Sequence, residues 1–193
     1  SRAAGGGGGG GVLAVLQPLP SLLAGKVSGA TAGAYTALAQ LCTTAAGASA
    51  TATTAGATAE AHGVLRALVG AASPRSGTAA ADAMAAHAAG PLPEMRAPSM
   101  ALLLACAELE WGATLLCGAE GVLELMLEHP RHDLGAEMLR QKHALAQALL
   151  RWPHVEAQLG TTTLARLRAY VAAGPFATTA ALAVPRVADA MAM

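Results

Sequence analysis

The chain has 193 residues, enough for one domain or for part of a longer array. Its 12 basic and 12 acidic residues cancel, so its net charge does not indicate binding to nucleic acid or to an anionic membrane surface. It contains no Ile and only 3% aromatic residues, whereas Ala, Leu and other good helix formers are frequent. We therefore predict an all-α fold.

The first 90 residues are rich in Ala, Gly and Thr and carry few structural signals. A glycine run dominates residues 1–11 and predicts a flexible linker. Residues 12–90 are predicted to form helical repeats of low sequence complexity. The N-terminal part is therefore expected to be helical, but its composition does not indicate a function.

Within this part, the clearest helix covers 30–44, and a loop with weak helical content is expected at 43–58. A short amphipathic helix is expected over 60–69, and Thr78 is placed to cap an alanine-rich helix over 79–89. The apolar residues that the first of these helices places on one side are Ala34, Leu38, Leu41 and Cys42.

Gly and Pro residues divide 91–176 into short segments, which we predict to form a C-terminal helical repeat domain. Pro93 or Pro98 begins the first helix, Asp133 caps the longest, and either of the first two Thr residues after Gly160 caps the last. The predicted helices cover 93–108, 111–117, 120–128, 133–151, 153–159 and 161–173.

Apolar residues at helical spacing within 91–174 are predicted to be buried in the core. They are Leu102, Leu103, Leu115, Leu123, Met138, Leu145, Leu149, Leu164 and Leu167. Short helices joined by Gly and Pro turns suit an armadillo or HEAT type of α-solenoid, and a compact helical bundle would show the same patterning. Residues 177–193 carry no core pattern and are predicted to be a disordered tail.

The cysteines are odd in number, lie among apolar residues, and include no pair with CxxC spacing. This pattern predicts buried free thiols in a reducing compartment and disfavours a disulfide scaffold or a zinc site. The three cysteines are Cys42, Cys106 and Cys117. No apolar run is long enough, without charges or helix breakers, to indicate a membrane span.

The nearest approach to a metal-binding pattern is formed by His129, His132, Asp133 and His143. Two of these histidines lie in a loop and His143 lies more than two turns into a helix, so convergence on one ion is not favoured. No recognisable nucleophile–base pair or cofactor motif is present. We therefore predict no enzyme activity, no cofactor, and no catalytic, cofactor-binding or metal-binding residues; an enzyme with an unrecognised site is the least favoured alternative.

The charges are unevenly distributed along the chain. Five acidic residues and no basic residue lie between Arg96 and Arg131, whereas basic residues predominate after that. These charges form either solvated helix faces or a surface that meets a partner. Arg166 and Arg168 either bind acidic groups of a partner or pair with Glu156. The two tryptophans are interpreted as core residues, with a partner-anchoring role as the alternative.

Several motifs in the C-terminal half follow the order and similar spacing of a known family. They are Pro91-Leu92-Pro93-Glu94-Met95, Glu110-Trp111-Gly112, Gly121-Val122-Leu123-Glu124, residues 133–150, and Arg166-Leu167-Arg168-Ala169-Tyr170 followed by Gly174-Pro175-Phe176. Together they resemble the C-terminal part of the 26S proteasome non-ATPase regulatory subunit 5 family. Pro98 departs from that family, because it is expected to interrupt a helix that is continuous there. Family members are longer and this chain begins with Ser, so we expect a C-terminal fragment or a processed chain.

The resemblance implies an armadillo-like array that acts as a non-enzymatic chaperone in assembly of the base of the 26S proteasome regulatory particle. Such a chaperone binds an AAA-ATPase subunit of the base and needs no nucleic acid, membrane, small-molecule substrate or cofactor. It implies a location in the cytoplasm, with the nucleus as an additional compartment. The partner-binding residues are not identified by the resemblance. The alternative is a generic armadillo-type scaffold that binds another partner.

Overall fold

The all-α prediction is confirmed in the part of the chain that the structure describes. The structure is a computed structural model that describes residues 28–51, 59, 62–67, 69, 78–127 and 135–176. All regular secondary structure in these residues is α-helical, and no strand occurs among them. Within the short helix predicted over 60–69, residues 62–67 are helical. The predicted linker at 1–11 and tail at 177–193 lie outside the described residues.

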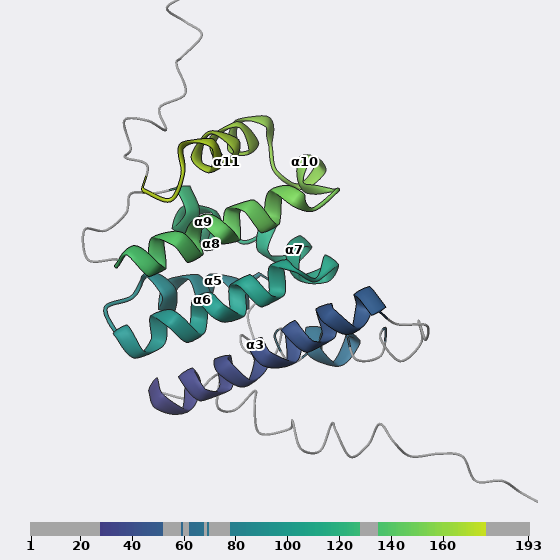
Figure 1. The fold of residues 1–193 in the computed structure, drawn as a ribbon, viewed down its shortest axis with the longest axis vertical. Helices are drawn as coiled ribbons and strands as arrows, with labels where there is room; N and C mark the ends of the chain where they lie inside the picture. Colours follow the sequence, from purple (N-terminus) through teal and green to yellow (C-terminus); the bar gives the residue numbers. More distant parts are fainter. Residues whose placement is uncertain are drawn as a thin grey trace, which may run out of the picture.

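Figure 1 shows the helices in successive layers. Their bounds are α3 Ser28–Thr51, α5 Ala79–Ala89, α6 Pro93–Ala107, α7 Glu110–Cys117, α8 Glu120–Leu127, α9 Ala136–Arg151, α10 Val155–Gln158 and α11 Thr161–Ala173. α6 lies between α3 and α9, α5 packs beside α6 and contacts α8, and α11 packs on α9 and α8. α7 and α10 contact each other at one end of the layers. This layering is consistent with an α-solenoid.

One continuous hydrophobic core runs through these layers. The predicted core residues that are buried are Leu102, Leu103, Met138, Leu145, Leu149, Leu164 and Leu167. Leu115 and Leu123 are only partly buried, which corrects the prediction for these two. The adjacent residues Leu116 and Val122 are fully buried instead, because each short helix is rotated by about one position relative to the expected face.

α3 is longer than its composition predicts. It continues to Thr51, so the loop expected at 43–58 is helical over its first part. The hydroxyls of Thr43 and Thr44 donate to the carbonyl oxygens four residues earlier, at 2.9 and 2.8 Å. These bonds satisfy the hydroxyls inside the helix, where Thr otherwise competes with the backbone. Leu41 is exposed rather than on the buried side, whereas Tyr35 is buried.

Pro98 lies inside α6 and does not interrupt it, contrary to expectation. Pro93 occupies the first turn, where its missing N–H costs no intrahelical bond. Pro98 removes the N–H that would bond the Glu94 carbonyl, but Glu94 is exposed at the helix start, where water can meet that oxygen. The helix therefore tolerates a second proline one turn into its length.

The predicted side-chain caps are not formed. Thr78 occupies the N-cap position of α5, but its side chain makes no capping hydrogen bond. α9 and α11 begin after Gly135 and Gly160, both in extended backbone and without a side-chain cap. Thr161 therefore lies within α11, and Asp133 lies outside the described residues. Glycine at the N-cap costs only a few tenths of a kcal/mol relative to Ser or Thr, so these starts are tolerated.

A hydrogen bond between distant residues joins α5 to the start of α8. The Gly121 N–H donates to Asp82 Oδ1 at 2.8 Å. A Cβ atom at Gly121 would lie 3.0 Å from the same oxygen, so a larger residue would force the carboxylate away. Asp82 thereby satisfies an N–H in the first turn of α8, which has no partner within that helix.

The three thiols are buried and free, as the sequence predicts. Cys42 on α3 and Cys106 on α6 are hydrogen-bonded to each other, which lowers the pKa of Cys42 despite its burial. The same hydrogen bond, together with burial, raises the pKa of Cys106. Burial also raises the pKa of Cys117, to about 11. These thiols therefore act as small apolar residues within the core.

None of the described helices is long and apolar enough by itself to cross a membrane. α6 and α7 reach the required length and composition only when taken together, and they are bent by 116° at the turn between them. α6 is packed on both sides, against α3 and α9. Its apolar residues are therefore those of a helix at the centre of the layers.

Candidate partner-binding site

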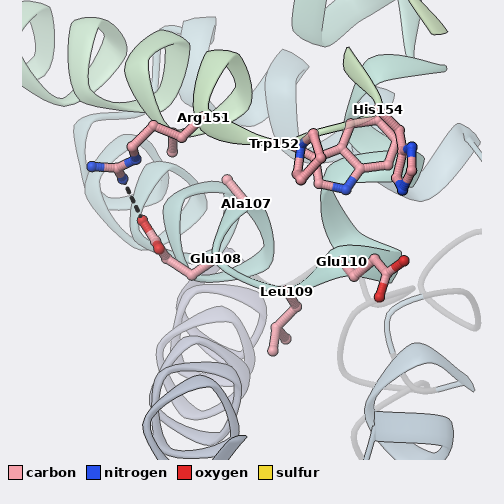
Figure 2. Close-up of a pocket in the computed structure, with 9 residues that line it drawn as sticks. Ala107, Glu108, Leu109, Glu110, Arg151, Trp152 and His154 are labelled. Atoms are coloured by element: carbon pink, nitrogen blue, oxygen red, sulfur yellow. Dashed lines mark hydrogen bonds and ion pairs between the residues drawn. The ribbon is translucent and has the colours of Figure 1, made fainter. Parts of the chain in front are cut away.

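A pocket of about 400 Å³ lies where two helix–helix turns meet, and we call it the corner pocket (Figure 2). The turn between α6 and α7 supplies one wall, and the turn between α9 and α10 supplies the other. Its lining residues are Ala107, Glu108, Leu109, Glu110, Ala148, Arg151, Trp152, Pro153 and His154. The volume lies within the usual range for ligand pockets, roughly 300–1,000 Å³.

Gly112 makes the sharp turn at the first wall possible. Leu109 has an extended backbone, and its N–H donates to the Cys106 carbonyl oxygen at 3.0 Å. A Cβ atom at Gly112 would lie 2.1 Å from that oxygen, a distance that real Cβ atoms do not adopt. Glycine is therefore required where α7 folds back against the end of α6, and this close approach fixes the positions of Glu108 and Glu110.

The second wall is a tight turn after α9. Trp152 has an extended backbone, and its N–H donates to the Leu149 carbonyl oxygen at 3.1 Å. The Val155 N–H then donates to the Trp152 carbonyl oxygen at 3.2 Å. α10 therefore begins at Val155, two residues later than the predicted start at Pro153. Proline suits this turn because it needs no N–H partner there.

An exposed ion pair closes one end of the corner pocket. Arg151 Nη2 lies 2.9 Å from Glu108 Oε1, and Figure 2 shows this pair bridging the two walls. The side chains are 69% and 56% exposed, so solvent screens the pair and its net contribution to stability is small. The carboxylate of the neighbouring Glu110 is exposed and makes no ion pair within the described part of the chain.

Aromatic rings form the other end of the corner pocket. The rings of Trp152 and His154 lie edge to face, with centroids 5.5 Å apart. In Figure 2 they lie side by side, with the Glu110 carboxylate across the pocket from them. Both Trp111 and Trp152 are partly buried against the core, which agrees with their interpretation as core residues. Each has a buried indole N–H that lacks an acceptor among the described residues.

The motif Arg166-Leu167-Arg168-Ala169-Tyr170 lies on α11 and divides between core and surface. Leu167 and Tyr170 are buried, and Arg166 is exposed. Arg168 forms an ion pair with Glu156, and both side chains are more than half exposed, so the arginine is also accessible to a partner. The motif therefore anchors α11 through its apolar residues and presents its arginines at the surface.

A buried lysine accompanies this motif and was not predicted from the sequence. Lys142 on α9 is only 3% exposed, and its Nζ lies 5.5 Å from the centre of the Tyr170 ring. His143 Nε2 lies 3.1 Å from the Val171 carbonyl oxygen. Burial raises the pKa of Tyr170 to about 12, and its hydroxyl has no hydrogen-bond partner in the described residues. These contacts join α11 to α9.

A second polar contact joins the N-terminal helices. Tyr35 Oη on α3 lies 2.8 Å from His87 Nδ1 on α5. Burial raises the pKa of Tyr35 to about 12 and lowers that of His87. The pair is consistent with a Tyr hydroxyl that donates to a neutral imidazole. It serves to join the two helices.

No group of three or more potential metal ligands converges within the described ranges. Of the four residues in the metal-like sequence pattern, His129, His132 and Asp133 lie outside those ranges. His143 contacts the backbone oxygen of Val171, as described above. We take the corner pocket as the candidate site, because it brings charged groups and an aromatic surface together.

The acid-rich stretch and both tryptophans can be recognised in the sequence, but the corner pocket was not predicted from it. Glu108 and Arg151 are separated by 43 residues, so their pairing depends on the stacking of α6 and α9. The local signal that was available is the coincidence of charged and aromatic residues at the ends of helices.

One known protein family matches more than half of this chain. The family described as the proteasome non-ATPase 26S subunit matches residues 75–190, more than half of the chain. The match includes α5 to α11, and with them the corner pocket and the α11 motif. No curated protein and no solved structure gives a match. The chain therefore belongs to the proteasome non-ATPase 26S subunit family.

Proposed function

We propose that this protein is a 26S proteasome non-ATPase regulatory subunit 5, a non-enzymatic chaperone that assembles the base of the regulatory particle. The observation that carries the proposal is the family match over 75–190. The ordered motifs from Pro91 to Phe176, which resemble that subunit in particular, support the finer assignment. The chaperone binds an AAA-ATPase subunit of the base, acts in the cytoplasm and nucleus, and leaves before the 26S particle is complete.

The surface chemistry of the described helices supports a binding role of this kind. Three ion pairs lie at the surface with side chains more than half exposed, which solvent keeps weak. Such charges are available to a partner at small cost in stability. Polar contacts of this type speed association and set specificity, while they allow the release that an assembly factor needs.

The test is direct binding to the separate base ATPase subunits. The tagged 193-residue chain is incubated with each recombinant subunit, at low and at physiological ionic strength, and bound protein is measured after washing. We expect one subunit to be retained, and retention to decrease as salt screens the charges. The complete 26S particle serves as the control and should not be retained stably.

Two outcomes would contradict the proposal. Retention of no base ATPase subunit at either ionic strength would reject ATPase binding by this 193-residue chain. Equal retention of the complete 26S particle would indicate a permanent subunit rather than an assembly factor. A generic armadillo-type scaffold would give the first of these outcomes.

A further inference from the structure

One carboxylate at the corner pocket has no ion-pair partner among the described residues. Glu108 is paired with Arg151 at 2.9 Å, whereas the Glu110 carboxylate has no ion-pair partner within the described residues. The lining carboxylates of Glu108 and Glu110 and the guanidinium group of Arg151 sum to one net negative charge, which lies at Glu110. The pocket therefore presents negative charge to any partner that approaches the α6–α7 turn.

The opposite side of the pocket suits a flat cation. The rings of Trp152 and His154, whose centroids are 5.5 Å apart, lie across the pocket from Glu110. A guanidinium group stacks on aromatic rings and also binds a carboxylate through two parallel N–H bonds. A carboxylate facing aromatic rings across a pocket offers both interactions at once.

The indole N–H of Trp152 lies beneath this surface. Its nitrogen is buried and lacks an acceptor in the described part of the chain, so a ligand in the pocket does not contact it. An arginine side chain therefore matches the two features that line the pocket, the Glu110 carboxylate and the aromatic rings.

We infer that the corner pocket binds an arginine side chain in a basic segment of the ATPase partner. The guanidinium group pairs with Glu110 and stacks on Trp152 and His154. This inference rests on the proposed function for the identity of the partner, but the pocket's preference for an arginine peptide is a property of this chain alone.

The first test uses tryptophan fluorescence and a defined peptide. Trp111→Phe leaves Trp152 as the single tryptophan, since the chain has two. Titration of this variant with an acetylated, amidated hexa-arginine peptide should give a saturable change in emission, and a hexa-glutamate peptide should give none. Adding Glu110→Lys should weaken arginine-peptide binding at least about tenfold, because one charge-assisted hydrogen bond is worth this much.

A charge reversal outside the pocket distinguishes binding in the pocket from attraction by the overall charge of the protein. Glu124 is exposed on α8, within the same acid-only stretch, and does not line the pocket. Glu124→Lys changes the net charge by the same amount as Glu110→Lys, but it should weaken peptide binding less than about twofold. No change in Trp152 emission, or equal weakening by the two reversals, would overturn the inference.

The second test uses the ATPase subunit retained by the chain without the Trp111 change. Glu110→Lys should reduce its retention, and Glu124→Lys should leave it nearly intact. ATPase binding that is unaffected by Glu110→Lys would overturn the pocket assignment while the proposed function stands. Specific binding of the arginine peptide without binding of any ATPase subunit would leave the pocket assignment standing and reject the proposed function.

Discussion

α5 and α9 contribute to the same core with different side chains. α5 buries small residues around one larger one: Ala80, Ala81, Met84, Ala85 and Ala88. α9 buries larger side chains, two leucines, a methionine and a lysine, beside two alanines: Met138, Lys142, Leu145, Ala146, Ala148 and Leu149. Small side chains let α5 lie close to α6 and α8, whereas α9 fills its contacts with leucine side chains.

The difference explains why the buried face of α9 can be predicted from the sequence, whereas that of α5 cannot. α9 carries charged residues on its outer face, so the alternation of polar and apolar residues is visible. α5 has alanine on both its buried and its exposed faces, so its composition does not indicate which side packs. Opposite substitutions should therefore destabilise the two interfaces. Shortening a buried side chain should destabilise the α9 interface, and enlarging one should destabilise the α5 interface.

The largest expected effect is at the leucine interface. Leu145 is fully buried, and Leu145→Ala should lower the free energy of unfolding by about 2–5 kcal/mol because it leaves a cavity. The measurement is the urea midpoint from helical circular dichroism. Gln147 is exposed on the same helix, and Gln147→Ala should change stability very little. A midpoint unchanged by Leu145→Ala would refute this view of α9.

The alanine interface should fail by overpacking. Ala88 is fully buried in α5, and Ala88→Leu should destabilise the protein by about 1–3 kcal/mol because its close neighbours leave no room. Ala86 is exposed on the same helix and provides the matched control. Ala86→Leu should be nearly neutral in the same urea titration. Equal effects of the two substitutions would show that α5 is not closely packed at Ala88.

A polar bond at this interface should have a smaller effect. Asp82→Ala removes the acceptor of the Gly121 N–H at the start of α8, and it should cost about 0.5–2 kcal/mol, as loss of a helix cap does. Asp82→Asn keeps an acceptor oxygen and should retain most of the stability. Comparison of the two unfolding midpoints checks this, and an Asn variant as unstable as the Ala variant would count against the hydrogen bond.

The smallest effect should distinguish the two buried tyrosines. Tyr35 bonds His87, so Tyr35→Phe should cost about 0.5–1.5 kcal/mol. The Tyr170 hydroxyl has no partner in the described residues, so Tyr170→Phe should leave stability unchanged or raise it slightly. Thermal unfolding of both variants gives the comparison. The reverse order of stabilities would show that the hydroxyl of Tyr170, rather than that of Tyr35, contributes the bond.

Much of the helical organisation from α6 onward could be predicted from the sequence. Gly118 ends α7 and Gly174 ends α11 as expected, and all three cysteines are buried and free. The exact starts of α9 and α10 and the cap residue of α11 were not predicted, because candidate caps in the sequence compete with each other and the packing of each turn selects one. The length of α3 was missed because the poor helix formers Gly and Thr are interspersed with Ala over 43–51.

The all-α class, the leucine face of α9 and the unpaired thiols follow from local propensity, helical periodicity and composition, so they could be predicted from the sequence. Which residues meet across the layers depends on tertiary packing. Glu108 meets Arg151 across 43 residues and Asp82 meets Gly121 across 39. Such contacts depend on how α5, α6, α8 and α9 stack, and periodicity within one helix carries no information about its neighbours. The corner pocket has the same origin, because two separate turns must lie side by side before its charge and its aromatic rings face each other.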